Sequence, residues 1–167
     1  MVKEIELTPE LEAMWLNYTK ELSKYNAVLA ARSDEERLKT LRSIHADPRG
    51  STLGIYNGSD QLIGFCMFAP EQDDSAAEIA EFYIRPEYRK TGYGTLAVLE
   101  IIKDVQLLYL EVLPENTGAK NFWKLLRSEF ELVSKSRRTD DGIITTAYYY
   151  RKKAEEKQNH SGSKPRS

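Results

Sequence analysis

The first third of the chain changes from alternating polarity to helical spacing. Residues 2–7 alternate, which predicts a short strand. Thr8 and Pro9 then suit the cap and the first position of a helix. Ser33 and Glu36 have capping-box spacing and predict the start of a second helix. The apolar residues after Pro9 fall on one helical face: Leu11, Met14, Trp15 and Leu22.

Strands predominate in the middle of the chain. Residues 52–56 and 61–69 are apolar runs joined by Asn57-Gly58-Ser59-Asp60, and Asn-Gly between such runs is a strong hairpin signal. The second run is apolar on both faces, as in a central strand. A further strand is predicted over residues 77–84.

The last third alternates helices and strands. Helices are predicted at about 95–103 and 117–128, a strand at 105–112, and a hairpin from 130–137 and 143–151. The element order is therefore β-α-α-β-β-β-α-β-α-β-β. It predicts an α+β (mixed α/β) fold with a mixed, mostly antiparallel sheet of six to seven strands and helices on both faces.

Composition limits the class of protein. With 167 residues, 41% hydrophobic and 30% charged, the chain can form one domain with a real core. No apolar run is long enough to span a bilayer, and the first residues lack a signal-peptide stretch, so we expect a cytoplasmic protein. The single cysteine, Cys66, excludes an intrachain disulfide and a multi-cysteine zinc site, and we expect no metal.

Charge is distributed unevenly. Residues 151–167 carry six Lys/Arg and two Asp/Glu, so residues 1–150 have a net charge of −6 within the total of −2. An acidic body argues against nucleic-acid binding and suits, weakly, a cationic substrate. We therefore expect a domain over residues 1–152 and a basic, disordered tail over residues 153–167.

One segment has the composition of an anion-binding turn. Arg89-Lys90-Thr91-Gly92-Tyr93-Gly94-Thr95 lies between a predicted strand and a predicted helix. Glycines allow close backbone approach, and the first helical turn has free N–H groups, so a pyrophosphate fits. The alternative is a turn without a ligand. The segment is neither a Walker loop nor the three-glycine dinucleotide motif.

Two motifs together resemble a known family. Ile84-Arg85-Pro86-Glu87-Tyr88-Arg89-Lys90-Thr91-Gly92-Tyr93-Gly94-Thr95-Leu96 is similar to the acetyl-CoA motif of the GCN5-related N-acetyltransferase (GNAT) superfamily. Leu110-Glu111-Val112-Leu113-Pro114-Glu115-Asn116, followed by Ala119, Phe122 and Trp123, resembles its strand–Asn–helix element. Glu81-Phe82-Tyr83-Ile84 together with Phe122-Trp123 further resembles a small group of predicted bacterial acetyltransferases of unknown substrate.

The resemblance implies acetyl-CoA as cosubstrate and an amine as acceptor. The glycine-rich turn would hold the pyrophosphate, and the strand before it would pair with the pantetheine arm beside a gap left by residues 110–113. Family members often form dimers, so a homodimer is one arrangement to test. The coenzyme A site would comprise Phe82, Tyr83, Ile84, Arg89, Lys90, Thr91, Gly92, Tyr93, Gly94, Thr95, Asn116, Ala119, Phe122 and Trp123. By spacing alone, Phe122 is also a plain core residue.

Two carboxylates are candidates for the catalytic base. Glu78 lies 11 residues before Arg89 and Glu81 lies 8 before it. Some family members place a base at the first spacing, and others place acidic substrate-binding residues near the second. Alternation points the two side chains to opposite faces unless a bulge intervenes. We favour Glu81, because it is nearer the expected thioester.

Trp123 departs from the family pattern. Many members have a tyrosine here, proposed to protonate the leaving thiolate, and an indole N–H is not a usable acid. Tyr93, Tyr109 or water could act instead, or the thiolate could leave unprotonated. The departure keeps open an alternative function, a non-catalytic acyl-CoA-binding domain.

Overall fold

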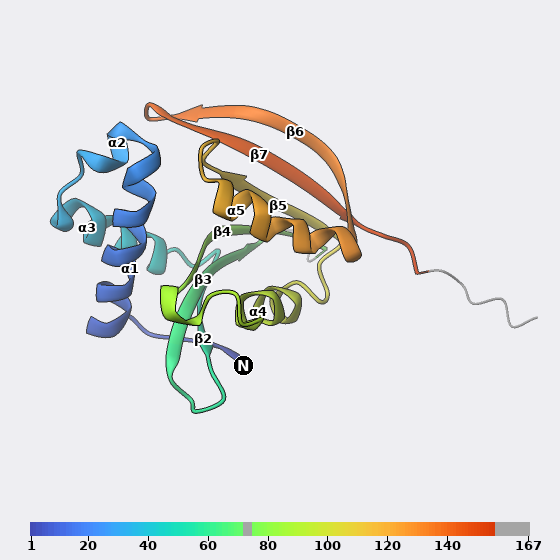
Figure 1. Ribbon diagram of the computed structural model, residues 1–167, viewed down its shortest axis with the longest axis horizontal. Coiled ribbons are helices and arrows are strands. Elements are labelled where there is room, and N and C mark those ends of the chain that lie inside the picture. The colour runs from blue at the N-terminus through green and yellow to red at the C-terminus, as the bar shows by residue number, and fades with distance from the viewer. Residues whose placement is uncertain (72–74, 156–167) are drawn as a thin grey trace, which may run out of the picture.

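The computed structural model describes residues 1–71 and 75–155. Its seven-stranded sheet has the order β1-β2-β3-β4-β5-β7-β6 (Figure 1). Only β4 and β5 are parallel, and all other neighbours are antiparallel. The strands are β1 (Val2–Glu4), β2 (Ser51–Tyr56), β3 (Leu62–Pro70), β4 (Ala76–Ile84), β5 (Leu107–Val112), β6 (Phe130–Asp140) and β7 (Ile143–Lys152).

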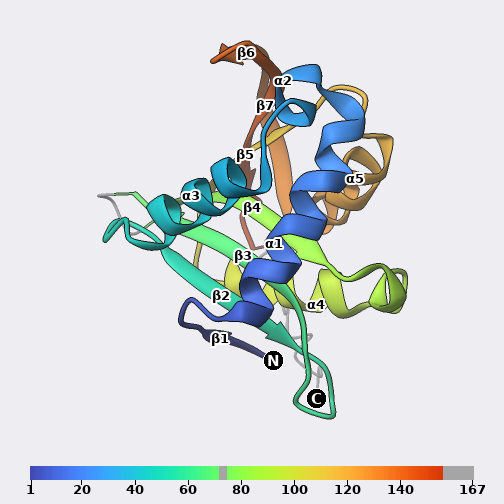
Figure 2. The same ribbon diagram turned by 90° about the vertical axis from the view of Figure 1, so that its left-hand side faces the viewer.

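Helices cover both faces of the sheet, as the element order predicts (Figure 2). The α-helices are α1 (Pro9–Leu22), α2 (Ala27–Ala30), α3 (Asp34–His45), α4 (Tyr93–Ile101) and α5 (Thr117–Phe122). The 3-10 helices are η1 (Ser23–Tyr25), η2 (Pro86–Tyr88) and η3 (Trp123–Ser128). This arrangement confirms the mixed α+β fold.

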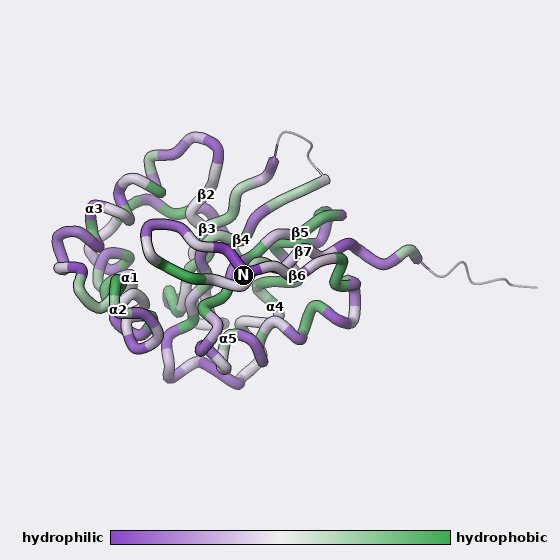
Figure 3. Tube along the Cα trace, turned by 90° about the horizontal axis from the view of Figure 1, so that it is seen from above, coloured by the Kyte–Doolittle hydropathy of each residue, from purple (hydrophilic) through white to green (hydrophobic). Residues whose placement is uncertain are grey.

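Two apolar cores lie on opposite faces of the sheet. On one face, buried side chains of α1 and α3 pack against Phe65, Met67 and Tyr83. On the other, α4, η3 and β5 contribute Val98, Leu126 and neighbouring residues. Apolar segments lie along the central strands and polar segments in the outer turns (Figure 3). Each face of β4 therefore has a different environment.

Local sequence signals agree with the structure at the element ends. Thr8 caps α1 with Pro9 in its first turn, and Ser33 and Glu36 form a complete capping box at α3. Asn57 and Gly58 lie in the turn between β2 and β3. These predictions are confirmed.

Some elements differ from the prediction. Helix α4 begins at Tyr93, inside the glycine-rich segment rather than after it. The predicted helix over 117–128 is α-helical only to Phe122 and continues as the 3-10 helix η3. The short helix α2 was not predicted, because four residues carry no readable periodicity.

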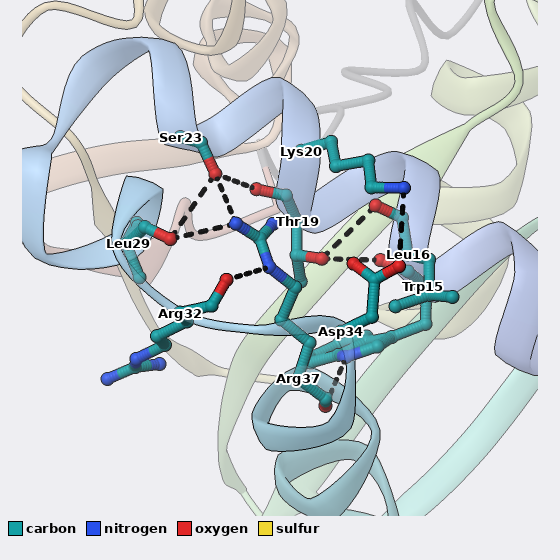
Figure 4. Close-up of polar contacts among 9 residues, drawn as sticks. All are labelled: Trp15, Leu16, Thr19, Lys20, Ser23, Leu29, Arg32, Asp34 and Arg37. Atoms are coloured by element: carbon teal, nitrogen blue, oxygen red, sulfur yellow. Dashed lines mark hydrogen bonds and ion pairs between the residues drawn. The ribbon is translucent and has the colours of Figure 1, made fainter.

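A buried arginine fixes α1 against α2 and α3 (Figure 4). The Arg37 guanidinium donates to Ser23 Oγ (3.0 Å), the Leu29 carbonyl (2.9 Å) and the Arg32 carbonyl (3.1 Å). The indole of Trp15 donates to the backbone carbonyl of Arg37 at 2.7 Å. These bonds between distant segments hold α1 in a defined place over the sheet.

Some sequence expectations fall outside the described residues. They include residues 72–74, between the strands predicted over 61–69 and 77–84, and residues 156–167 of the tail. Within the described part of the chain, no helix has the length and apolar character needed to cross a membrane.

Candidate active site

The sheet opens into a fork between β4 and β5. These strands pair only from Ala76–Ile79 to Leu107–Leu110, and the rest of β4, residues 80–84, has no partner on its β5 side within the described chain. The backbone of β4 is therefore available there to an added extended chain. This is the gap that the family resemblance implies beside Phe82, Tyr83 and Ile84.

A β-bulge precedes the fork. Glu81 pairs with Met67, while Ile79 pairs with Phe68, so Ala80 is the extra residue on β4. Glu78 in turn pairs with Ala69, two residues from Met67, which places both glutamates on the same face of the sheet. Plain alternation predicted opposite faces, and the bulge is the reason why that default is wrong here.

Glu81 forms a hydrogen-bonded pair with a tyrosine of α1. The Tyr18 hydroxyl donates to Glu81 Oε2, and the pair is partly buried. Burial raises the pKa of Glu81 to about 7, the hydrogen bond from Tyr18 lowers it, and the charge of Glu78 raises it further. A carboxylate in this range exchanges protons near neutral pH, as a general base must.

Aromatic rings surround this pair. Tyr18 packs between Trp15, Phe65 and Tyr83, whose ring centroids lie 5.5 to 5.7 Å from its own. Tyr18 thus links Glu81 to an aromatic cluster, and burial is the main cause of the raised pKa of Glu81.

Glu78 belongs to a second polar cluster on the same face of the sheet. It pairs across to Tyr109 of β5, whose hydroxyl donates to Glu111, and Glu111 also accepts from Thr145 Oγ1 at 2.5 Å. Burial, then the charges of Glu111 and Glu71, raise the pKa of Glu78. The face beside the fork is therefore lined by carboxylates.

The opposite face of β4 is apolar at the same level. Phe82 stacks on Phe122 with centroids 5.2 Å apart, and Trp123 meets both rings edge-on. Trp123 is buried, and Ala119 packs against the same core. Asn116 caps α5, with its side chain accepting from the Ala119 N–H at 3.0 Å. Here packing and capping account for the strand–Asn–helix element.

The glycine-rich turn opens α4 without a side-chain cap. Gly92 has a φ of +90° and is the N-cap residue, so the first-turn N–H groups that follow have no side-chain acceptor in the described chain. A Cβ on Gly92 would meet nothing within 4 Å, whereas one on Gly94 would approach Phe122 Cε2 at 3.1 Å. Gly92 keeps the turn open, and Gly94 lets α4 pack closely.

Arg89 is already engaged within the protein. Its Nε donates to the Ile84 carbonyl at 2.8 Å, and its Nη2 contacts both carboxylate oxygens of Glu21, at 2.9 and 3.0 Å. Its backbone N–H donates to the Pro86 carbonyl. Arg89 therefore ties the glycine-rich turn to α1. Lys90, Thr91, Tyr93 and Thr95 complete the turn around Gly92.

The residues present fit coenzyme A. An uncapped helix N-terminus after an open glycine suits a pyrophosphate, and the unpaired edge of β4 suits an amide-bearing extended arm. The two features lie at opposite ends of the connection from residue 85 to residue 92. One elongated ligand could contact both.

Two residues of this site were missed by sequence reasoning. Tyr18 belongs to the apolar stripe of α1, and its polar tip faces the sheet. Glu21 follows one turn later and binds Arg89. In the sequence, Tyr18 is visible only as a tyrosine at core spacing. Sequence alone does not show that it bonds to a glutamate 63 residues away.

The sequence matches the model of one protein family. The model of the Acetyltransferase (GNAT) family matches residues 12–126. No curated protein matches the sequence significantly.

Several solved structures share the fold. A spermidine N-acetyltransferase from Vibrio cholerae, in complex with CoA and spermine, is 16% identical with a TM-score of 0.63, covering 90% of this chain and 92% of that one. A ribosomal-protein-alanine N-acetyltransferase from Brucella melitensis is 19% identical, with a TM-score of 0.58 and coverages of 91% and 98%. An acetyltransferase from Thermus thermophilus is 21% identical, with a TM-score of 0.59 and coverages of 89% and 96%.

Proposed function

Because the chain belongs to the GNAT acetyltransferase family, we propose that it transfers an acetyl group from acetyl-CoA to a primary amine of a small molecule or peptide. The observation that carries this proposal is the position of Glu81. It lies two residues beyond the last β4–β5 pair, at the fork where an acetyl thioester would sit. The transfer is direct, with both substrates bound together.

In this proposal the coenzyme lies along the fork and over the glycine-rich turn. The edge of β4 near Phe82–Ile84 pairs with the pantetheine arm, and the N–H groups at the start of α4 hold the pyrophosphate. Acetyl-CoA supplies the activated carbonyl. The chain's task is to hold that carbonyl beside an amine and to remove the amine's proton.

Glu81 takes that proton. The amine nitrogen bonds to the acetyl carbon, the carbon–sulfur bond breaks, and sulfur leaves with the electron pair as a thiolate. The acceptor arrives as an ammonium ion, so two protons leave its nitrogen: one passes to Glu81 and then to solvent before the attack, and the second leaves by the same route once the carbon–nitrogen bond has formed. An amine with a pKa near 10 is mostly charged at pH 7, so a base contributes about 10²–10⁴-fold.

The acceptor would enter on the α1 face. Glu78 and Glu111 lie on this face, and the β6–β7 turn approaches α2, with a Cβ on Gly142 placed 3.4 Å from Val28 (Figure 1). Carboxylates favour a cationic acceptor. Spermidine and an alanine of a ribosomal protein, which the names of two similar structures give as acceptors, are reasonable first candidates.

The experiment has two parts. Calorimetric titration with acetyl-CoA should give binding at tens of micromolar or tighter, and an amine panel with spermidine and alanyl peptides should show acetyl-CoA-dependent acetylation. Absence of binding would refute the proposal. Tight binding without turnover across the panel would favour the alternative, a non-catalytic acyl-CoA-binding domain, which the tryptophan at position 123 suggested.

A further inference from the structure

We propose that Tyr18 is a positioning residue for the proposed reaction: its hydroxyl holds one oxygen of Glu81 and leaves the other to receive the amine proton. The proposal rests on the proposed function. Tyr18 lies on α1, outside both motifs that identify the family, and nothing in the sequence marks it as part of a site.

The two carboxylate oxygens of Glu81 have different surroundings. Oε2 accepts from Tyr18, whereas Oε1 accepts from no described residue. In the described chain, Arg37 Nη1 is the only fully buried side-chain nitrogen or oxygen without a partner. Oε1 of Glu81 therefore retains contact with solvent, and it is the oxygen that can take a proton.

Packing leaves Tyr18 little freedom. Its ring meets Trp15, Phe65 and Tyr83, and burial is the main cause of the raised pKa of its hydroxyl. The hydroxyl therefore stays protonated and remains a donor at neutral pH. A fixed donor favours the charged form of its acceptor, so it opposes the effect of burial on Glu81.

Other titratable groups surround the pair. Glu78 from β4 raises the pKa of Glu81. The Cys66 thiol of β3, whose own pKa is raised chiefly by burial, remains neutral. Glu21, one turn after Tyr18, faces Arg89 and Tyr83. Of these groups, only Tyr18 stabilises the ionised form of Glu81 by a direct hydrogen bond.

The same helix also holds the glycine-rich turn. Tyr18 contacts Glu81 and, one turn later, Glu21 contacts Arg89 at 2.9 Å. Helix α1 thus joins the proposed base to the start of the proposed coenzyme site. The hydroxyl's separate contribution can be isolated, because Tyr18→Phe keeps the ring and removes only the donor.

The test compares wild type and Tyr18→Phe by two measurements. The side-chain carboxyl ¹³C signal of Glu81 is titrated in the free protein, and kcat/KM is measured against pH. Loss of a hydrogen bond to a charged group should move the midpoint of Glu81, and the acidic limb of kcat/KM, upward by roughly one pH unit. The variant should approach the wild-type rate at high pH.

Tyr83→Phe is the matched control for the midpoint. It removes a hydroxyl from the same ring cluster, but that hydroxyl faces Glu21 at 3.4 Å, so the Glu81 midpoint should stay in place. An unchanged midpoint in Tyr18→Phe, or a moved midpoint with an unmoved acidic limb, would overturn the proposal. If wild type acetylates no amine, the proposed function fails, while a moved midpoint still establishes the Tyr18–Glu81 coupling.

Discussion

The two faces of β4 at the fork differ sharply in chemistry. On the α1 face, Glu81 accepts a hydrogen bond from Tyr18, whose side chain packs among other aromatic residues. On the α5 face, Phe82 packs on Phe122 and Trp123, and no carboxylate belongs to that cluster. Residues adjacent in sequence, Glu81 and Phe82, thus enter opposite environments, as the pleat of a strand requires.

This difference suggests that one face binds the cofactor and the other transfers the proton. The face with α4 and α5 offers aromatic packing and an uncapped helix start, whereas the α1 face holds a carboxyl group with a pKa of about 7. The substitution of a tryptophan at position 123 for the tyrosine common in the family fits that division. Proton chemistry would then lie on one side of the sheet only.

The largest effect is expected when the proposed pyrophosphate site is blocked and the α1 face is left unchanged. Gly92→Asp adds a carboxylate where a pyrophosphate would bind and forces a side chain into a φ of +90°. We expect acetyl-CoA affinity to fall by at least about 100-fold, because the change removes favourable helix-end electrostatics and adds repulsion. Calorimetric titration measures it.

Gly92→Ala is the matched control for this change. It has the same backbone strain without the charge, and its Cβ would meet nothing within 4 Å, so the loss of affinity should be much smaller. The Glu81 midpoint should be unaltered in both variants. Normal acetyl-CoA affinity in Gly92→Asp would show that the turn is not the pyrophosphate site.

The next largest effect is expected on the α1 face, in the pH dependence of the free energy of unfolding. The pKa of Glu81 is raised from 4.5 to about 7, so its stabilising contribution is complete below pH 4.5 and is lost as pH rises through 7. Glu81→Gln accepts the Tyr18 bond without a buried charge. It should stabilise the fold at pH 8 by on the order of 1–3 kcal/mol.

Denaturant unfolding at two pH values checks this prediction. At pH 4 both proteins carry a neutral group at position 81, so their free energies of unfolding should be similar, which makes pH 4 the internal control. A variant less stable than wild type at pH 8 would contradict the buried, high-pKa environment of Glu81.

The smallest effect is expected on the α5 face. Trp123→Tyr restores the hydroxyl common in the family, and Trp123→Phe has nearly the same shape without it. If this face has no part in proton transfer, kcat should differ between the two by less than about threefold, under about 1 kcal/mol in barrier. A tenfold advantage for Trp123→Tyr would assign thiolate protonation to this face.

The features that could be predicted from the sequence are those that depend on residues close together in the chain. The capping box at Ser33 and Glu36 and the Asn57-Gly58 turn are decided within four residues, and both were predicted. Periodicity and the family motifs predicted a sheet of six to seven strands and the order of the elements except α2, and the sheet has seven strands.

Features that depend on a partner strand or helix were not predictable. The bulge at Ala80 exists only in the register against β3, yet it decides on which face Glu78 lies. Tyr18 and Glu81 are 63 residues apart, and Glu21 and Arg89 are 68 apart. A motif names Arg89 as part of an anion site, but only the packed structure shows that Glu21 already neutralises its charge.

The central claim is that Glu81 removes the amine's proton at the fork, and the most direct test is the pH dependence of kcat/KM in wild type and Glu81→Gln. In wild type we expect kcat/KM to fall on the acidic side of about pH 7. In the variant we expect a loss of about 10²–10⁴-fold around neutral pH that shrinks as pH rises and the free amine forms unaided. A variant with wild-type kcat/KM across the whole pH range would contradict the account.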